Sequence, residues 1–153
     1  MPSLAPTDTH RDAEELANII IVLHRCFLLN LSKELANGNV SIAQYFLLGH
    51  LDQKGSASMT EIAQKMGHTT AAATGLVDRL ENLGYITRNH ATADRRKVIV
   101  EITAKGLALV HRIREDMIKN VRKVMTHLTP DEQSSWLHIY QKIFQYCQSQ
   151  DHE

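Results

Sequence analysis

Three consecutive cationic residues, Arg95, Arg96 and Lys97, follow a small polar segment and precede an alternating apolar run. Guanidinium and ammonium groups attract phosphates, and an Arg at the tip of a hairpin can follow the negative potential of a narrow minor groove. The alternative interpretation is a solvated polar turn, which an isolated charge run commonly forms. The chemistry that this stretch offers is electrostatic contact with a polyanion, and its meaning depends on the elements that position it.

Length and composition limit what this stretch can mean. The chain has 153 residues, of which 43% are hydrophobic and 5% aromatic, so one domain with an aliphatic core is expected. Lys and Arg number 17, and Asp and Glu also number 17, so no global field attracts nucleic acid. Any attraction to a polyanion must come from local segregation of charge.

The cysteines and the apolar segments indicate a cytoplasmic protein. Cys26 and Cys147 lie far apart, which gives neither a disulfide framework nor a metal-binding spacing. The first residues carry acids and no apolar run, unlike a signal peptide. The most apolar stretch, residues 19–31, contains His24 and Arg25, and we interpret it as too short and too polar to span a bilayer. We therefore expect no membrane association.

Long helices are expected near both ends of the chain. After a flexible tail over residues 1–11, a helix over residues 12–37 has apolar residues on nearly all its faces. A helix over residues 129–149 starts at the segment TPDE, which combines an N-cap, a Pro at the first helical position and a capping Glu. In so small a protein, a second subunit is the expected cover for this apolar surface. These two helices should therefore form a dimer interface, and residues 104–127 should form a long connecting helix.

The segment between these helices contains shorter elements with clear start and stop signals. Ser41 and Gln44 form a capping box, which opens a helix whose inner face would use Ile42, Tyr45, Phe46, Leu48 and Leu51. A turn over residues 54–58 should follow. The next helix, residues 60–66, would be capped by Thr60 or by Ser58, and Gly67 ends it.

A second short helix and two strands complete this segment. The helix starts at Thr69 or Thr70 and ends at Gly84. Residues 85–89 and 97–103 are strand-like, and the three cations lie between them. Helix, turn, helix and basic hairpin in this order predict a winged helix-turn-helix over residues 41–103. The fold class is therefore mainly α with a small β-hairpin, and it contains six helices with an intertwined helical dimer interface.

At these residues the chain resembles the MarR family of bacterial transcriptional regulators. The matching segments are MTEIAQKMGHTTAAATGLVDRLENLGYITR and DRRKVIVEITAKG, and the second carries the Asp-x-Arg wing signature of the family. The resemblance covers roughly residues 12–148. It implies that the long first and last helices build a homodimer, that an Arg of the wing reaches toward the minor groove, and that Asp94 pairs with a nearby Arg.

The predicted contacts with double-stranded DNA come from the second short helix and from the wing. Hydroxyls can bond phosphates or base edges, and methyl groups can pack against thymine methyls. A cap is the alternative role of the first two threonines. The candidate DNA-binding residues are Thr69, Thr70, Ala71, Ala73 and Thr74 on the helix, and Arg88, Asp94, Arg95, Arg96 and Lys97 on the wing.

The predicted recognition helix departs from the family pattern because it has few cations. No Lys or Arg lies between Gly67 and Asp78, and Gly75 occupies a position where many relatives carry a larger polar or basic residue. Direct base readout should therefore be modest, with affinity resting on the wing. Arg79 can be a structural partner of Asp78, Glu81 or Asp94, or a phosphate contact.

Signals that would control such a regulator are less specific in the sequence. Polar groups in apolar surroundings suggest a site for a small phenolic or carboxylate effector, and the alternative is that each is a satisfied interface or surface residue. Cys26 could sense oxidants, although burial as a small hydrophobe is the favoured interpretation. No metal-binding spacing and no cofactor motif occur. The effector candidates are His24, Arg25, Tyr45, His50 and His111.

The expected function is a homodimeric DNA-binding transcriptional regulator, a repressor that binds a pseudo-palindromic operator. The alternative from another class is a winged-helix module that binds a protein instead of DNA, which the neutral net charge favours slightly. No nucleophile with a base at a suitable spacing and no phosphate-cradling Gly loop are present, so an enzyme is not expected.

Overall fold

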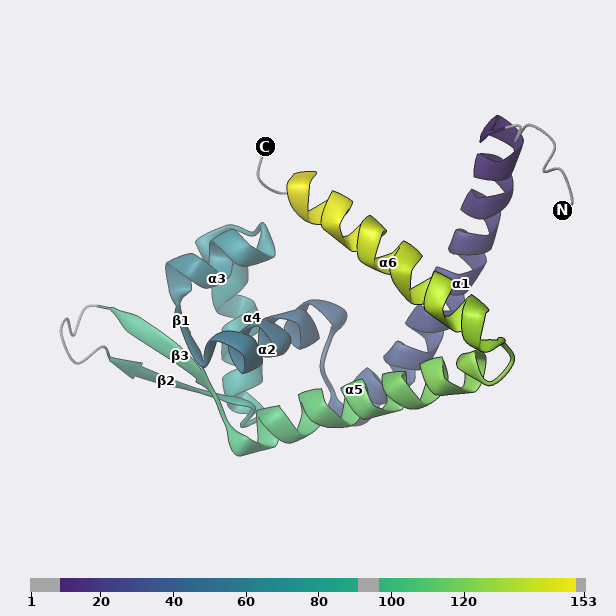
Figure 1. Cartoon of the computed structure of the whole chain (residues 1–153). Helices are drawn as coiled ribbons and strands as arrows, with labels where there is room; N and C mark the ends of the chain where they lie inside the picture. The colour runs from purple at the N-terminus through teal and green to yellow at the C-terminus, as the bar shows by residue number, and fades with distance from the viewer. Residues whose placement is uncertain (1–8, 91–96, 151–153) are drawn as a thin grey trace, which may run out of the picture. The chain divides into compact units, whose positions relative to one another are not determined.

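The structure is a computed structural model that describes residues 9–90 and 97–150. The predicted wing residues Asp94, Arg95 and Arg96 lie outside the described residues. The chain divides into two compact units, the first ending at His111 and the second beginning at Arg112. The first unit contains the winged helix-turn-helix (Figure 1).

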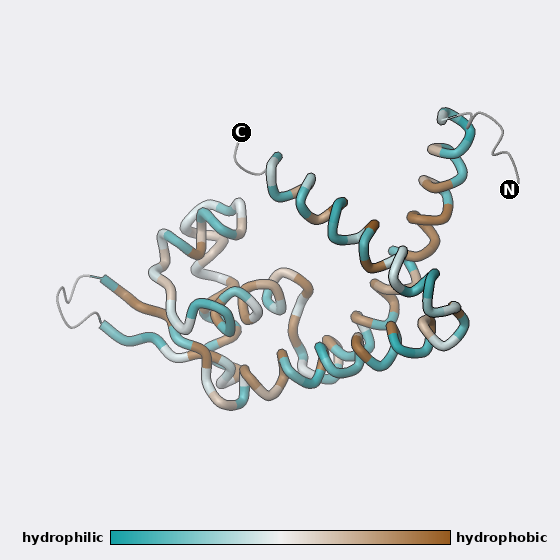
Figure 2. Tube along the Cα trace, viewed as in Figure 1, coloured by the Kyte–Doolittle hydropathy of each residue, from teal (hydrophilic) through white to brown (hydrophobic). Residues whose placement is uncertain are grey.

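Helix α1 (Thr9–Gly38) confirms the predicted long first helix. Its C-terminal end is anchored, because Leu31 and Leu35 are buried and the Val40 N–H donates to the Leu35 carbonyl over 3.1 Å. Asn39 closes the helix in the left-handed region, with φ 55°. The rest of its apolar surface is exposed, as the brown band along this helix in Figure 2 shows. The exposed residues are Leu16, Ile19, Ile20, Ile21, Val22, Leu23, Phe27, Leu28 and Leu29.

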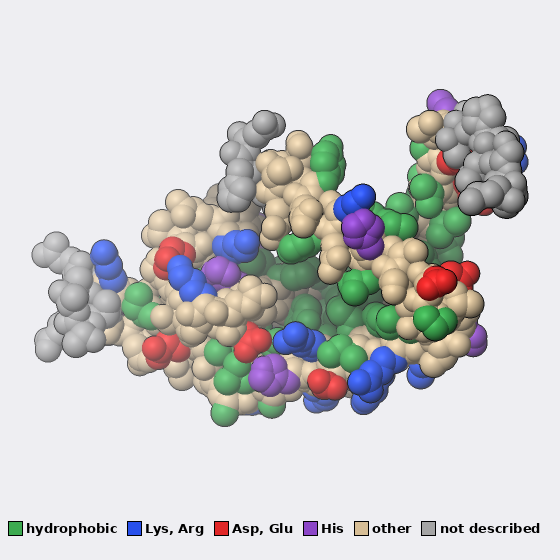
Figure 3. Space-filling view, viewed as in Figure 1, with side chains coloured by type: hydrophobic (Ala, Val, Ile, Leu, Met, Phe, Trp, Pro, Cys, Tyr) green, Lys and Arg blue, Asp and Glu red, His purple; other side chains and the backbone are tan. Residues whose placement is uncertain are grey.

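The apolar surface of α1 is longer than the sequence interpretation allowed. An 18-residue window of this helix has a mean hydropathy of 1.4, and 6% of it is buried. By length and composition alone α1 could cross a bilayer, so the prediction that this stretch is too short and too polar to span one is wrong. A helix covered by another protein chain gives the same pattern. Figure 3 shows hydrophobic side chains exposed along this helix.

Helices α2 (Ile42–Lys54), α3 (Met59–Met66) and α4 (Thr70–Asn82) form the core of the first unit. The capping box of Ser41 and Gln44 is confirmed, with the Ser41 N–H donating to Gln44 Oε1 over 2.8 Å. Ser58, the second of the two candidate caps, opens α3 through a capping box with Glu61. Gly67 ends α3 in the left-handed region, with φ 61°. Residues that are completely buried include Leu47, Leu48, Leu51, Ile62, Val77 and Leu80.

The predicted inner face of α2 is partly wrong. Leu48 and Leu51 are buried as expected, but Phe46 is 59% exposed and Ile42 is also exposed. Leu47 and Gln44 occupy the core instead. Gln44 can lie there because its amide oxygen accepts the Ser41 N–H, so the polar group is partly satisfied. The buried stripe of α2 therefore includes a polar capping residue, which hydrophobicity alone does not indicate.

The wing is part of a three-stranded antiparallel sheet with the order β1-β3-β2. Strands β2 (Ile86–His90) and β3 (Val98–Ile102) form the predicted hairpin, in which Arg88 lies opposite Val100. The predicted turn over residues 54–58 is wrong in part, because Ser56–Ser58 forms strand β1 against β3. Ser58 is thus the last residue of β1 and the cap of α3.

Helix α5 (Ala104–Met125) begins in the first unit, directly after Thr103. The Thr103 hydroxyl accepts the Gly106 N–H over 3.2 Å and donates to the Gly84 carbonyl over 2.8 Å, so one residue caps α5 and fixes the start of the wing. Gly84 itself has φ 76°. Tyr85 fixes the end of α1 by donating its hydroxyl to the Gly38 carbonyl over 2.8 Å.

In the second unit, α6 (Pro130–Gln150) begins as predicted. The Thr129 N–H donates to Glu132 Oε2 over 2.8 Å, and this bond and the Thr129 hydroxyl lower the pKa of Glu132 below its ordinary value. None of the residues of α6 is buried. Its exposed apolar residues are Leu137, Ile139, Tyr140, Ile143, Phe144 and Tyr146.

Candidate nucleic-acid interface

The second helix of the helix-turn-helix exposes its first turn. Thr69 precedes α4 and its hydroxyl accepts the Ala72 N–H over 3.3 Å, so the capping role is confirmed. Thr70, Ala71 and Ala72 are exposed beside it. Thr74 is half-buried, and its hydroxyl donates to the Thr70 carbonyl over 2.8 Å, which leaves its oxygen and methyl group for other contacts. This turn therefore presents small methyl and hydroxyl groups.

Ala73 was predicted to contact DNA, and the structure contradicts this. Its side chain is completely buried, so its methyl group packs in the core beneath α4. The exposed methyl group at this end of the helix belongs to Ala72, which lies one position earlier. In a short Ala-rich helix the apolar pattern does not distinguish a small core residue from a small surface residue, and packing against the neighbouring helices decides.

Arg88 does not project freely from the wing. Its Nη2 donates to Asp78 of α4, and its Nε lies 3.4 Å from Glu81 Oε2. The Nε atom is buried without a well-aligned hydrogen bond, although the ion pair with Glu81 supplies the opposite charge. The side chain is 26% exposed. Arg88 thus connects the second strand of the sheet to α4, and the geometry indicates a clamp between them instead of the predicted phosphate contact.

Arg79 was expected to pair with Asp78, Glu81 or Asp94, and its observed partner is different. Its Nη2 donates to Asn39 Oδ1 over 3.1 Å, which joins α4 to the loop between α1 and α2. Asp78 and Glu81 are occupied by Arg88. The side-chain acids adjacent in sequence were therefore the wrong partners, because Arg79 and Asp78 point to different flanks of the helix.

The described ends of the wing carry exposed polar side chains. Lys97 precedes β3 and His90 ends β2, and both are exposed. Asn89 Nδ2 donates to Glu101 Oε2 over 2.8 Å, which connects β2 and β3. The predicted contact of Lys97 with DNA stays a prediction.

An ion pair stabilises the start of α3. Lys54 Nζ donates to Glu61 Oε1, and Glu61 Oε2 accepts the Ser58 N–H over 2.7 Å. These bonds lower the pKa of Glu61 to about 2. Burial lowers the pKa of His50, and the positive charges of Lys65 and Lys54 lower it further. Because the lowered pKa favours a neutral His50 at physiological pH, this residue does not add a third cation beside Lys54 and Lys65.

The effector candidates lie on different elements and differ in burial. His24 and Arg25 lie on the exposed part of α1, whereas Tyr45 and His50 are half-buried on α2. His111 Nε2 lies 3.4 Å from Asp52 Oδ1, which satisfies that histidine on the surface. None of these residues lines the cleft of about 490 Å³ that involves α1, α2 and α4.

The sensor alternatives based on cysteine and metal can also be placed. Cys26 and Cys147 are both exposed, so the interpretation of Cys26 as a buried small hydrophobe is wrong for the single chain. Within residues 9–90 and 97–150, no group of three or more His, Cys, Asp and Glu side chains could hold a metal ion.

The helix-turn-helix, its three-stranded sheet and the exposed first turn of α4 define a winged-helix protein. The model of the MarR family matches residues 40–98, the segment that contains these elements. Together with the similarity to the repressor MdtR described next, this match shows that the chain belongs to the MarR family, a family of transcriptional regulators.

Individual relatives agree with this assignment. The transcriptional repressor MdtR of Bacillus subtilis is 30% identical over 112 residues, which cover 73% of this chain and 72% of MdtR. The uncharacterized regulator YfiV of the same organism is 31% identical over 97 residues, which cover 63% of this chain and 61% of YfiV. A MarR family protein from Bacillus stearothermophilus shares the fold, with a TM-score of 0.81, 20% identity, and coverage of 94% of this chain and 99% of that one.

Proposed function

We propose that the protein is a cytoplasmic repressor that binds pseudo-palindromic operator DNA as a homodimer. The observation that carries this proposal is the exposed first turn of α4, with Thr70 and Ala71 on the surface, in a chain of the MarR family. Helices in this position of a helix-turn-helix enter the major groove, and methyl and hydroxyl groups can read base edges there. The repressor activity of the relative MdtR supports the direction of regulation.

The dimer part of the proposal rests on the apolar surfaces of α1 and α6. Each helix, within its own unit, exposes large aliphatic or aromatic side chains along its length, and α6 has no buried residue. Such surfaces on a water-soluble chain are normally covered by another protein surface. A second subunit supplies this cover, and a two-fold dimer places its reading helices about 34 Å apart, which matches successive major grooves on one side of the duplex.

A DNA-binding assay with wing variants tests the proposal. Arg96→Ala should weaken binding to the promoter of the protein's own gene and lower the salt dependence of log K by about 0.9, because one phosphate contact is lost. Arg122→Ala, which removes an exposed cation of the second unit, is the matched control and should change neither quantity. Wild-type protein that does not bind any duplex at low salt would refute DNA binding and favour the alternative of a protein-binding module.

Relief of repression by a small effector extends the proposal. Tyr45 and His50 are half-buried on one helix, and an aromatic or carboxylate compound could bind beside them. Operator affinity measured with a panel of benzoates and phenols should fall for at least one compound. Unchanged affinity across the panel would remove ligand control from the proposal.

A further inference from the structure

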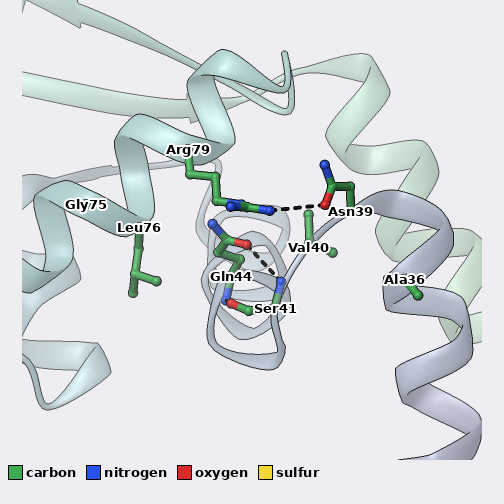
Figure 4. Close-up of a pocket in the computed structure, with 8 residues that line it drawn as sticks. All are labelled: Ala36, Asn39, Val40, Ser41, Gln44, Gly75, Leu76 and Arg79. Carbon is green, nitrogen blue, oxygen red and sulfur yellow. Dashed lines mark hydrogen bonds between the residues drawn. The ribbon is translucent and has the colours of Figure 1, made fainter.

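A cleft beside the recognition helix α4 combines apolar residues with the polar side chains of Gln44 and Arg79. It has a volume of about 490 Å³ and lies among the end of α1, the start of α2 and one flank of α4 (Figure 4). No acidic side chain lines it. The lining residues are Ala36, Asn39, Val40, Ser41, Gln44, Gly75, Leu76 and Arg79.

The amide of Gln44 has an unused donor that faces this cleft. The side chain is 2% exposed, and its oxygen accepts the Ser41 N–H over 2.8 Å. This bond fixes the orientation of the amide, so its NH₂ group points the other way, toward Arg79, as Figure 4 shows. Within the described chain this NH₂ group has no partner. The nitrogen is not among the fully buried polar atoms that lack a partner, so it reaches solvent through the cleft and is available to an incoming acceptor.

Arg79 adds a positive charge at the same place. One guanidinium nitrogen donates to Asn39 Oδ1 over 3.1 Å, which holds the group at the cleft and leaves further N–H groups for another acceptor. The first backbone N–H groups of α2, after Ser41, add positive potential. The Gln44 amide and the Arg79 guanidinium are both donors at this cleft, and an oxyanion could accept hydrogen bonds from both.

The position of the cleft indicates which oxyanion binds. Gly75, Leu76 and Arg79 lie on one flank of α4, and Gly75 and Arg79 are exposed at the rim. A helix in the major groove has the phosphate backbone along its flanks, at the height of its middle turns. Gly75 has no atom within 4 Å of the position of a Cβ, so the approach to the cleft is open from this side. A macromolecular phosphate can therefore enter, whereas an enclosed ligand pocket would need a covered rim.

We propose that this cleft binds a backbone phosphate of the operator, held by Arg79 and by the Gln44 amide. This inference rests on the proposed function and adds two contacts to it. It also supplies a cation that the first turns of α4 lack, since Arg79 is the only Lys or Arg within Thr70–Asn82. The anchor between α4 and the start of α2 fixes the register of the reading helix without reading sequence.

Gln44→Glu is a sharp test because it changes the donor and retains the cap. A Glu at this position of a capping box still accepts the cap N–H, as Glu61 does from Ser58 over 2.7 Å. The substitution replaces the free NH₂ by a carboxylate oxygen, which repels a phosphate. Operator affinity should fall by about tenfold or more, with an unchanged circular-dichroism spectrum. Gln53→Glu adds the same charge at an exposed position near the other end of α2, outside the lining of the cleft, and it should bind like wild type.

Arg79→Gln tests the charge separately. It should weaken binding to all sequences by a similar factor, about three- to tenfold, and lower the salt slope by about 0.9. If wild type binds the operator and both variants bind it equally well, the inference is refuted while the proposed function stands. If wild type binds no duplex, the proposed function has failed.

A third measurement distinguishes DNA phosphate from a free anion. Inorganic phosphate titrated into wild type without DNA should show only weak binding, in the millimolar range. If Gln44→Glu and Arg79→Gln abolish tight binding of inorganic phosphate but leave operator affinity unchanged, the cleft is a site for a small free anion, and the assignment to the DNA backbone is wrong.

Discussion

Arg88 provides a prediction that separates a clamp from a phosphate contact. The wing strand β2 is joined to α4 by the pairs of this residue with Asp78 and Glu81. Arg88→Ala removes both pairs and leaves two carboxylates one turn apart on the same helix without a cation. DNA binding should weaken because the wing is no longer held against the recognition helix, and not because a phosphate has lost its partner.

The burial of the Arg88 side chain sets the magnitude. An exposed ion pair contributes about 0.2–1 kcal/mol, whereas hydrogen bonds to charged groups contribute about 1.5–3 kcal/mol. The side chain is 26% exposed, its partner Asp78 is 52% exposed and Glu81 is 41% exposed. We therefore expect the free energy of unfolding to fall by about 1–2 kcal/mol, between those limits. For a chain of this size the melting temperature should fall by about 3–6 °C.

The assay combines thermal unfolding with a salt series of operator binding. Arg88→Ala should melt earlier and bind more weakly, with the same slope of log K against log salt as wild type. Arg88→Lys retains the charge but loses the planar fork, so it should recover only part of the stability. A double-mutant cycle with Asp78→Asn should give a coupling energy of about 1 kcal/mol. An unchanged melting temperature together with a slope that falls by about 0.9 would refute the clamp and restore the phosphate contact.

Three further predictions concern stability and assembly. In a denaturant titration, Gly106→Ala should lower the free energy of unfolding of the first unit by about 1–3 kcal/mol. The new Cβ would clash with the Tyr85 carbonyl oxygen and lie 2.7 Å from Ile102 Cγ1. The control Gly49→Ala, whose Cβ meets nothing within 4 Å, should be neutral or stabilising. The pKa of Glu61 is lowered to about 2 in the folded state, so the ionised carboxylate stabilises the fold fully above the ordinary pKa of a Glu. This stabilisation is lost as the pH falls toward 2. Glu61→Gln should therefore flatten the acid side of a plot of stability against pH, and an unchanged plot would exclude this contribution. Ile21→Lys on exposed α1 should shift the sedimentation coefficient toward a monomer, and a species of unchanged mass would show that this surface is not the interface.

Local signals in the sequence were sufficient for the helix boundaries. The capping boxes that begin at Ser41 and Ser58 and the cap at Thr129 are visible as short polar patterns, and the structure forms the corresponding hydrogen bonds. Gly67 and Gly84 mark positions with positive φ, which few other residues adopt. Helix caps and glycine stops depend on residues that are close in sequence, so they can be predicted from the sequence alone.

Features that depend on distant residues were missed. Strand β1 has only small polar and Ala residues with no apolar alternation, and it exists because Ala57 pairs with Val100 of β3. The partner of Arg79 is Asn39, 40 positions away, and no sequence pattern distinguishes it from the adjacent acids. The buried amide of Gln44 is also inconspicuous, since its capping role explains the residue fully until its burial is known. Conversely, the charge of Arg88 on a wing strand suggested a contact with DNA, but the fold places Asp78 and Glu81 beside it.

Ser58 belongs to β1 and also caps α3, and this dual role limits where insertions and deletions can be accommodated. Ser58 pairs with Ile99 in the middle strand of the sheet and caps α3 at the same time. An extra residue within β3 would slide the register and displace the first turn of α3, so it would disturb the helix-turn-helix as well as the hairpin. An extra residue between His90 and Val98 lies beyond the paired positions and leaves that junction intact. Length variation among related chains, and engineered loop grafts, should therefore concentrate in the connection between the two strands and be rejected at their base.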